Sequence, residues 1–594
     1  MLTTRNVVQV CLTVFLASSC IAIPAFAQDV FDAVPADALF AVRINNFEYT
    51  LGQIDQFLTG LAPAPNSAAM MGRMQLANAL GDPNLSGINL RGQVAVFGTA
   101  VQNEPNAIPK MFVAGIIPVT DYKTFISSNR SATKPDANGI STIGPMKFLV
   151  TQDANFAILT QPADYAALAN AVKTAKTKKL SATLTAAQRD AAGKARIWAY
   201  GNVQQAQKLY GPMIVSKMEE AKKAMSAKDP NMAQFSQFMA VYVDLVKSLM
   251  NETKDITIAA NPKADLLGLT GTLAAIPGTE TAKTLTASAA AKGPNKLLGY
   301  APDNAFETMA GKIDKPVIIN MYSKFLDAMA PLFGPKFTAD EKAKVSKLIA
   351  DSVNPLGLNF MFSAATEPNS TPPFSAMYVF EVVDAEAFRK NINAWTEMID
   401  APYMQDLFKQ LGFQITYKIT QNAEQYNGVA IDEAKMTMKS YDPNSMMSQM
   451  IVKVYGHALT YKMATVNGLA LWTMGTGADA KIKALIDKTK AGEPNAVNSE
   501  FKNAMALLPD SNTAQFVGTY NYLRVLQLSA GFMPVVPSNT ASLQNFTSKS
   551  NIAFGGNIGN GDIAFSIVVP KQHILEIKSA FETFMPKQAK SCRP

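Results

Sequence analysis

Histidine and cysteine are almost missing from this chain, whose 594 residues include two histidines and three cysteines. Histidine is the commonest acid–base residue of enzymes, so its scarcity leaves few sites for general acid–base catalysis. His457 is predicted to start a strand and His573 to begin an amphipathic helix, and a structural role is the favoured interpretation of both. The His-Glu-x-x-His zinc helix, the P-loop and the Gly-x-Ser-x-Gly elbow do not occur. We therefore assign no catalytic, cofactor-binding or metal-binding residue and no cofactor.

Two of the cysteines, Cys11 and Cys20, lie in an N-terminal segment with the composition of a secretory signal. Arg5 is followed by an apolar run over residues 7–23 and then by the small-residue stretch 25–27. These features predict a signal peptide over residues 1–27 and an exported chain, in the periplasm, at the cell envelope or outside the cell. A lipidated Cys20 is the less favoured alternative, because the aliphatic residue before it, Leu16, is one position too far away.

Once the signal is removed, Cys592 is the last cysteine, so the mature chain has no internal disulfide. Disulfides are chiefly a need of small exported domains, and a chain of this size has enough core to fold without one. Long apolar runs are missing as well. No later segment approaches the stretch of about 18 apolar residues that a membrane helix needs, so no membrane span is expected in the mature chain.

Charge is sparse, with 17% charged residues and a formal net charge of +8. Lysines are spread along the chain, and a dense group at Lys176, Lys178 and Lys179 has no aromatic residues between its members. A solvated loop is the favoured interpretation of this group. We therefore expect no nucleic-acid partner.

What the sequence does contain is a repeat of its own pattern. Residues 34–40 (VPADALF) return as residues 300–306 (YAPDNAF), and apolar helices and paired strands follow each copy in the same order. A pattern that recurs at a nearly constant separation indicates a repeated structural unit. We predict an internal duplication into two homologous α+β halves, residues 28–292 and 293–594, with an insertion near residues 401–450.

Tight hairpins are predicted between the strands. Asn-Gly is the dipeptide best suited to the two positive φ angles of a two-residue hairpin turn. It occurs between apolar, alternating runs at four places, which are Asn138-Gly139, Asn427-Gly428, Asn467-Gly468 and Asn560-Gly561. The clearest of these hairpins joins residues 552–554 to residues 563–565. The sheets are therefore expected to be antiparallel.

Amphipathic helices are expected between the strands. Helices are predicted to begin at Asp121 and at Asp384, each directly after a strand. The helix from Asp384 and the closing helix each repeat large apolar residues along one face. These residues are Phe388, Ile392, Trp395 and Ile399 in the first helix and Ile574, Ile577, Phe581 and Phe584 in the second. The predicted fold class is α+β, with antiparallel hairpin-rich sheets on which amphipathic helices pack.

Three short motifs have chemical interpretations that we weigh against structural ones. The strings Ser131–Lys134 and Ser499–Lys502 match Ser-x-x-Lys, in which a lysine activates a serine, but the companion motifs of serine acyl enzymes do not occur. The segment from Asp82 begins like a calcium loop, but its twelfth position is Gln93 instead of the bidentate glutamate. A helix-to-strand turn is therefore favoured for this segment.

Methionine is plentiful, with 29 residues. Five of them gather in the predicted insertion, at Met436, Met438, Met446, Met447 and Met450. Thioethers can hold copper(I), but no histidine or cysteine joins the cluster, so core filling or an adaptable apolar surface is favoured. Two predicted helices, over residues 205–225 and 232–250, also carry broad apolar faces, which pack on a sheet or line a lipid-sized pocket.

The openings at residues 34–40 and 301–306 resemble a loosely defined group of exported bacterial domains that open with a Pro-Ala-Asp turn and have no assigned function. The resemblance implies an envelope location and transfers no catalytic residue. The leading hypothesis is an exported, non-enzymatic interaction or scaffold module whose partner is another envelope protein. The alternatives are a periplasmic carrier of an apolar, lipid-like ligand and an unrecognised hydrolase, and fold alone decides none of them.

Overall fold

The computed structural model describes residues 29–61, 67–101, 109–228, 247–248, 250–288, 293–367, 370–443, 446–492, 497–530 and 546–584. The predicted signal peptide and Cys592 lie outside these residues. The chain is a mixed α and β protein that divides into two compact units. Unit 1 comprises Met1–Lys217 and Met250–Ile276, and unit 2 comprises Met218–Leu249 and Pro277–Pro594.

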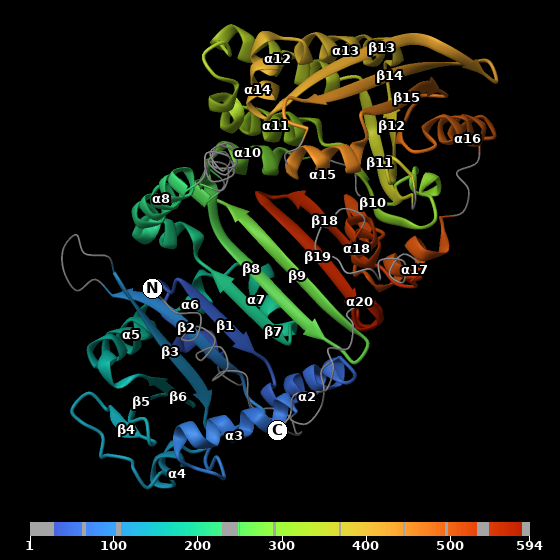
Figure 1. Cartoon of the computed structure of the whole chain (residues 1–594). Helices are drawn as coiled ribbons and strands as arrows, with labels where there is room; N and C mark the ends of the chain where they lie inside the picture. Colours follow the sequence, from blue (N-terminus) through green and yellow to red (C-terminus); the bar gives the residue numbers. More distant parts are fainter. Residues whose placement is uncertain are drawn as a thin grey trace, which may run out of the picture. The chain divides into compact units, whose positions relative to one another are not determined.

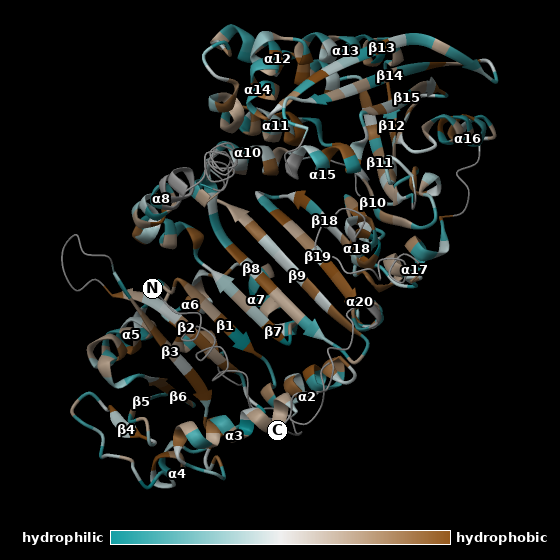
Figure 2. Cartoon of the chain, in the orientation of Figure 1, coloured by the Kyte–Doolittle hydropathy of each residue, from teal (hydrophilic) through white to brown (hydrophobic). Residues whose placement is uncertain are grey.

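Unit 1 is built on one antiparallel sheet. Its strands are β1 (Phe40–Ile44), β2 (Val94–Val101), β3 (Lys110–Pro118), β4 (Ser141–Ile143), β5 (Phe148–Asp153), β6 (Phe156–Thr160), β7 (Ile197–Gly201), β8 (Thr253–Pro262) and β9 (Leu266–Ala275). They lie in the order β4-β5-β6-β3-β2-β1-β7-β8-β9 (Figure 1). Figure 2 shows mostly apolar residues along β2 and β3, as expected for central strands that are covered on both faces.

Helices cover both faces of this sheet. They are η1 (Val30–Ala33), α2 (Phe47–Leu58), α3 (Ala68–Leu80), α4 (Tyr122–Ser127), η2 (Pro162–Asp164), α5 (Tyr165–Thr177), α6 (Leu180–Thr183) and α7 (Ala186–Lys194). Helix α8 (Val203–Lys228) begins in unit 1 and ends in unit 2. One apolar core joins η1 and α5–α7 to the first sheet face, around Phe31, Phe97 and Trp198. A second core joins α2, α3 and α4 to the other face, around Phe47 and Leu51.

Unit 2 has an antiparallel sheet of its own. Its strands are β10 (Ala305–Lys312), β11 (Leu356–Thr366), β12 (Phe374–Val382), β13 (Phe413–Tyr426), β14 (Val429–Ser440), β15 (Ala458–Val466), β16 (Leu469–Gly475), β17 (Phe516–Tyr520), β18 (Ile552–Gly559) and β19 (Asp562–Pro570). They lie in the order β13-β14-β15-β16-β12-β11-β10-β17-β18-β19.

The helices of unit 2 also form two layers. They are α10 (Glu280–Ala287), η3 (Leu298–Tyr300), α11 (Lys315–Met329), η4 (Ala330–Phe333), α12 (Ala339–Val353), α13 (Ala385–Ile399), α14 (Pro402–Gln410), α15 (Met446–Tyr455), α16 (Ala478–Lys490), α17 (Ser499–Leu507), α18 (Tyr522–Ala530) and α20 (Lys571–Phe584). Helix α16 packs on the first sheet face through Ile482, Leu485 and Ile486. Helices α11, α12 and α14 and η4 share a separate core of their own, around Phe333 and Tyr403.

The two units have the same strand order. In each, the first strand (β1 or β10) lies at the centre, with the hairpin of the second and third strands on one side and the last three strands on the other. Unit 2 has one additional edge strand, β13, which with α14 lies in the predicted insertion near residues 401–450. The mixed, antiparallel fold class is confirmed, and the origin of the halves by duplication stays a prediction.

Three of the four Asn-Gly pairs form the predicted hairpin turns. Asn427-Gly428, Asn467-Gly468 and Asn560-Gly561 connect adjacent paired strands, and both residues of each pair have positive φ. The prediction is wrong for Asn138-Gly139, which precedes β4 without joining it to another strand. There the Asp136 carboxylate accepts hydrogen bonds from the backbone N–H groups of Asn138 and Ile140, so a side chain shapes the turn.

Both aspartate-started helices form as predicted. The Asp121 carboxylate caps α4 by accepting from the N–H groups of Lys123 and Thr124, and the Asp384 carboxylate caps α13 by accepting from the N–H of Ala387. Such a cap satisfies backbone donors that have no partner inside the helix, and removing one typically costs about 1 kcal/mol. Each of these helices begins directly after a hairpin partner strand, β3 or β12, so the caps also fix where the chain leaves the sheet.

The closing helix α20 buries only part of the predicted face, where Ile577 packs against Leu523. Phe581, predicted to be on the buried side, is 40% exposed, whereas His573, Glu576 and Ala580 are buried. The reason is that the Glu576 carboxylate accepts hydrogen bonds from Ser548 and Ser550, which turns a polar face of the helix inward. The side chain of Phe584 lies outside the described residues. Among the described helices, none is long and apolar enough to span a bilayer.

Candidate functional site

The two histidines lie in different surroundings. His457 is exposed and lies one residue before β15, the strand that it was predicted to start. His573 is fully buried, and its Nε2 accepts a hydrogen bond from the backbone N–H of Tyr522 at 3.2 Å. Burial lowers the pKa of His573, while Glu576 raises it and Arg524 lowers it. A buried ring whose Nε2 is occupied by the backbone holds structure and is closed to a substrate.

The two Ser-x-x-Lys strings do not bring a lysine to a serine in the structure. The Ser131 hydroxyl donates to Asn129 Oδ1 at 2.6 Å, and Lys134 is exposed. Ser499 and Lys502 are both exposed at the start of α17. An activated serine needs its base within hydrogen-bond reach, and neither pair is held in such a contact by the described residues.

The calcium-like segment is a turn between a helix and a strand, as favoured above. It connects α3 to β2, and the Asp82 carboxylate accepts from the backbone N–H groups of Asn84 and Ser86. Within the described residues no group of His, Cys, Asp and Glu side chains is arranged to hold a metal ion. In the methionine cluster, Met436 and Met438 lie half-buried on β14, and the side chains of Met446, Met447 and Met450 lie outside the described part.

The helix predicted over residues 205–225 is confirmed as part of α8, whose Ile214 and Met218 are half-buried. The second helix, predicted over residues 232–250, lies almost wholly outside the described residues. The site that follows is formed by the strands of unit 2.

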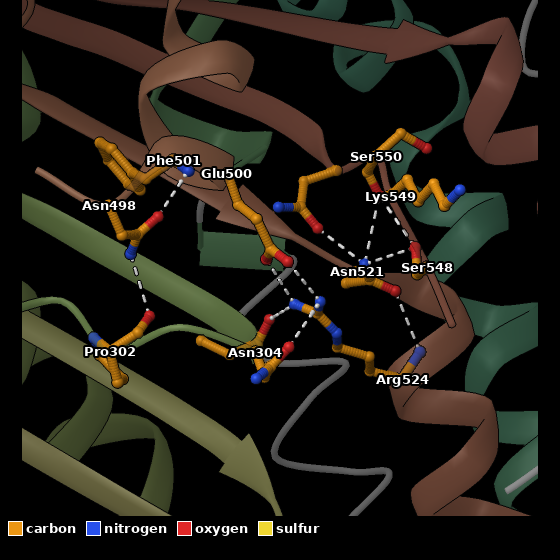
Figure 3. A network of polar contacts seen from close by, with 12 residues as sticks. Pro302, Asn304, Asn498, Glu500, Phe501, Asn521, Arg524, Ser548, Lys549 and Ser550 are labelled. Carbon is orange, nitrogen blue, oxygen red and sulfur yellow. Dashed lines mark hydrogen bonds and ion pairs between the residues drawn. The ribbon is translucent and has the colours of Figure 1, made fainter. Parts of the chain in front are cut away.

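A buried polar network ties together the ends of three strands of unit 2 (Figure 3). Asn521 follows β17 and caps α18, because its Oδ1 accepts from the backbone N–H of Arg524 at 3.0 Å. Its Nδ2 donates to Ser548 Oγ at 2.9 Å and to Asn551 Oδ1 at 2.7 Å. Its backbone N–H also donates to Phe306 O, which links the end of β17 to the start of β10.

Arg524 completes this network from the first turn of α18. Its guanidinium donates to both carboxylate oxygens of Glu500 at 2.9 Å and to the carbonyl oxygen of Ala305 at 2.7 Å. The Arg524 side chain is 7% exposed, so the pair is largely shielded from water. Two-pronged contacts of this kind are strong and directional, and here they hold α17 and α18 against the start of β10.

Ser548, Glu576 and His573 lie close together but do not form a catalytic triad. The Ser548 hydroxyl donates to Glu576 Oε2 at 2.7 Å, whereas His573 Nδ1 is 3.9 Å from that oxygen. A triad requires the histidine to take the serine proton, and here the serine is bonded to the carboxylate. All three side chains are buried. We interpret the cluster as part of the polar network that fixes the end of β17.

Directly beyond this network lies the second face of the unit 2 sheet, the face opposite α16. Cross-strand pairing places Phe362, Tyr378 and Trp472 in one row across β11, β12 and β16. The rings of Phe362 and Tyr378 are 4.8 Å apart, and those of Tyr378 and Trp472 are 6.4 Å apart. We call this surface the aromatic face, and define it by Phe362, Tyr378, Phe380, Tyr417, Tyr461 and Trp472.

The aromatic face is only half-buried, although helices lie beside it. All six of its rings keep partial exposure, while the alternate positions on the same strands, such as Met361, Val379 and Leu471, are buried. Phe388 of α13 does contact the Trp472 ring at 5.9 Å. Phe388 and Ile392 of α13 pack in a small core with Phe380 and Trp472, whereas α11, α12 and α14 bury apolar side chains against one another around Phe333. An apolar surface that is left partly open can serve as a binding site.

Glu307 is the one acidic residue at the edge of this surface where β10 meets β17. It pairs directly with Tyr520 across the two strands, on the face opposite Thr308, whose hydroxyl lies 2.9 Å from that of Ser363 on the α16 side. Within the described residues no hydrogen bond or ion pair joins the Glu307 carboxylate to another side chain. Two phenols, those of Tyr378 and Tyr520, interact electrostatically with it.

The pKa shifts around Glu307 indicate that this edge of the aromatic face has low polarity. Burial raises the pKa of the Glu307 carboxyl above its ordinary value. Burial also raises the pKa of Tyr378, with further contributions from Glu307 and Tyr322, and that of Tyr520, with contributions from Glu307 and Tyr522. Desolvation disfavours the charged form of each group. Tyr322 on α11 and Tyr522 on α18 therefore lie near this edge too, and both are exposed.

The aromatic face was not predicted, although the sequence contains the pattern that indicates it. Phe360 and Phe362, Tyr378 and Phe380, and Trp472 and Met474 each alternate with smaller or aliphatic residues, which is the period of a strand. That alternation reveals two apolar faces but not which one is closed by helices. Only the packing of α16 on one face and the separate core of α11, α12 and α14 distinguishes them.

Comparisons with protein-family models, with curated proteins and with solved structures find no match to this chain.

Proposed function

We propose that this chain is an exported, non-enzymatic binding protein that holds an apolar ligand on the aromatic face of unit 2. The observation that carries the proposal is the partial exposure of six aromatic side chains on a sheet face where α13 packs on Phe380 and Trp472 while α11, α12 and α14 pack on one another. Exposing such rings to water is unfavourable by about 25 cal/mol per Å² of apolar surface, so an apolar ligand gains that free energy when it covers them. Export is supported by the composition of residues 1–27.

The exposed side of α11 supports the same proposal. Met321, Tyr322 and Phe325 are 59%, 47% and 46% exposed and lie on adjacent turns of one helix face. Tyr322 is near enough to Tyr378 to influence its ionisation, so this helix face borders the aromatic face. Together they offer apolar side chains from a helix and from a sheet to one ligand.

A scaffold that binds an envelope protein is the second candidate, and α11 is the observation that favours it. A row of exposed apolar side chains on one helix also suits a protein partner. The two candidates differ in which residues carry binding. A ligand on the aromatic face requires Tyr378, whereas a partner seated on α11 alone requires Met321 and Phe325 and is indifferent to Tyr378.

Binding of a neutral fluorescent probe, N-phenyl-1-naphthylamine, tests the proposed function. We expect the mature chain to enhance its emission saturably, and we expect Tyr378→Ser to weaken that binding by about ten-fold, or about 1.4 kcal/mol. Tyr441→Ser is the matched control, because Tyr441 is 59% exposed and lies just after the end of β14, outside the aromatic face. Equal loss in both variants, or no saturable binding, would refute the proposal.

Native mass spectrometry of the chain purified from its own envelope gives the natural ligand. We expect a mass excess that disappears on denaturation, and extraction then identifies the bound molecule. A bare chain mass together with cross-links from α11 to an envelope protein would instead support the scaffold candidate.

A further inference from the structure

Glu307 is an unusual residue for an apolar surface, because it brings a carboxylate without a cation. Within the described residues it has no arginine, lysine or histidine partner, and burial alone accounts for its raised pKa. Elsewhere in unit 2 half-buried carboxylates are paired, as Glu500 is with Arg524 and Asp432 with Arg389. A desolvated carboxylate left without a partner is costly, so its retention points to a partner that comes from outside the chain.

The surroundings of Glu307 suit a positively charged partner. Tyr520 lies directly opposite Glu307 on β17, where paired side chains have Cβ atoms about 4.5–5.5 Å apart. Tyr378 lies within electrostatic range from β12, and Tyr322 and Tyr522 border the same edge from α11 and α18. Aromatic rings attract cations through the negative charge of their faces, and carboxylates attract them directly.

We propose that the ligand of the aromatic face is a cationic amphiphile whose amine head lies between the Glu307 carboxylate and the rings of Tyr378 and Tyr520. This inference rests on the proposed function, since it names the ligand class of the same site. The head group is a protonated or quaternary amine. The apolar tail runs from Glu307 along the row of Phe362, Tyr378 and Trp472, whose rings continue across three neighbouring strands.

The Glu307 carboxylate disfavours two other ligand classes at the same position. A fatty acid would place its carboxylate beside Glu307, where two like charges repel each other in a medium of low polarity. A neutral amphiphile would cover the rings but leave the carboxylate desolvated without a partner. The expected order of affinity is therefore cationic, then neutral, then anionic, for ligands with the same tail.

Three surfactants with the same alkyl tail test this order, each used below its critical micelle concentration. They are dodecyltrimethylammonium, dodecyl maltoside and dodecanoate, titrated into the full mature chain by isothermal calorimetry at neutral pH. We expect the cation to bind about ten-fold more tightly than the neutral compound. In Glu307→Gln, which keeps the shape of the side chain and removes its charge, we expect that preference to fall below two-fold, about 0.4 kcal/mol.

Glu397→Gln is the matched control. Glu397 is exposed on α13 in the same unit, so its substitution changes the net charge equally and leaves the aromatic face untouched. We expect this variant to keep the full preference for the cation. An unchanged preference in Glu307→Gln, or an equal loss in Glu397→Gln, would overturn the inference while leaving the proposed function in place if dodecyl maltoside still binds. Failure of all three compounds to bind would overturn both.

The unaltered chain offers a second measurement if Glu307→Gln does not fold. Glu307 must be ionised to attract an amine, so affinity for dodecyltrimethylammonium should rise with pH from below 4.5 to neutrality, while affinity for dodecyl maltoside stays constant. The groups that interact with Glu307 are the phenols of Tyr378 and Tyr520, and the phenols of Tyr322 and Tyr522 interact in turn with these two. Phenols ionise near pH 10, far above this range. A flat profile for the cation contradicts the inference.

Discussion

The second sheet faces of the two units differ sharply, although the strands lie in the same order. In unit 1 the end of this face beneath α2, α3 and α4 is closed, because Val94 packs there in one core with Phe47 and Leu51 of α2. In unit 2 the corresponding face carries large aromatic rings that stay partly exposed. The same topology therefore supports aliphatic side chains sealed by helices or a partly exposed row of aromatic rings.

The residues at comparable positions explain the difference. The closed end of the unit 1 face carries aliphatic side chains, such as Ile44, Val94 and Ile117, on which the helices pack, whereas its middle, around Val113 and Ala199, is half-buried. Gly98 lies beneath the Phe40 ring, and a Cβ there would be 2.3 Å from that ring. In unit 2 bulky rings such as Phe362 and Tyr378 occupy the middle of the face. There α11, α12 and α14 pack on one another, and α13 packs on Phe380 and Trp472.

Truncating Phe47 should have the largest effect on stability. Phe47 is 2% exposed in the closed core of unit 1, so Phe47→Ala leaves a cavity and should lower the free energy of unfolding of that unit by about 3–5 kcal/mol. The emission of Trp198, which is buried in unit 1, reports that unit during urea unfolding. A loss below about 1 kcal/mol would mean that this face is not closed.

Removing the Arg524 guanidinium should destabilise unit 2 by less. Arg524→Ala deletes charge-assisted hydrogen bonds to Glu500 and to the Ala305 carbonyl, which we expect to cost about 2–3 kcal/mol. Trp472 emission during urea unfolding measures this loss of stability. Arg524→Lys keeps the charge but cannot form the two-pronged contact, and we expect an intermediate loss. Wild-type stability in the alanine variant would show that the network does not hold the end of β10.

Truncating Phe362 should cost much less than truncating Phe47. Its ring is half-buried, so Phe362→Ala loses a fraction of the burial energy, about 1 kcal/mol, and leaves no sealed cavity. The same variant should weaken binding of N-phenyl-1-naphthylamine several-fold. A stability loss as large as that of Phe47→Ala, measured in parallel, would show that the aromatic face is a core and would remove the contrast between the units.

Acidification should produce the smallest effect, confined to unit 2. The pKa of buried His573 is lowered, so the folded state binds a proton less readily than the unfolded state, and its contribution to stability is present above pH 6.5 and lost as pH falls through the folded pKa. For one group the slope is at most about 1.4 kcal/mol per pH unit. We expect His573→Asn to reduce the pH dependence of the free energy of unfolding, as followed by Trp472 emission. An unchanged pH dependence would mean that another group titrates.

Local features were predictable from sequence because they depend on neighbouring residues. The hairpins at Asn427, Asn467 and Asn560 follow from the backbone preference of Asn-Gly, and the caps at Asp121 and Asp384 follow from side chains that reach the next turn. The failure at Asn138 is local too, since the nearby Asp136 carboxylate determines that turn.

The polar and aromatic sites were not predictable in the same way. His573 and Glu576 have the spacing of one helix face, but only contact with Ser548 and Tyr522, distant in sequence, turns that face inward. Likewise, Glu307 is an ordinary strand glutamate in the sequence, and its surroundings arise from the pairing of β10 with β17 and the nearness of β12.

The sequence by itself determined the mixed α and β class, the antiparallel hairpins, and which strands alternate apolar and aromatic residues, because backbone propensity and side-chain period act over a few residues. The tertiary structure decided which sheet face is sealed. That outcome depends on whether helices fit against the sheet or against one another, and the fit is a property of side-chain volumes brought together from distant segments. The half-open aromatic face around Glu307 is the consequence of that fit in unit 2.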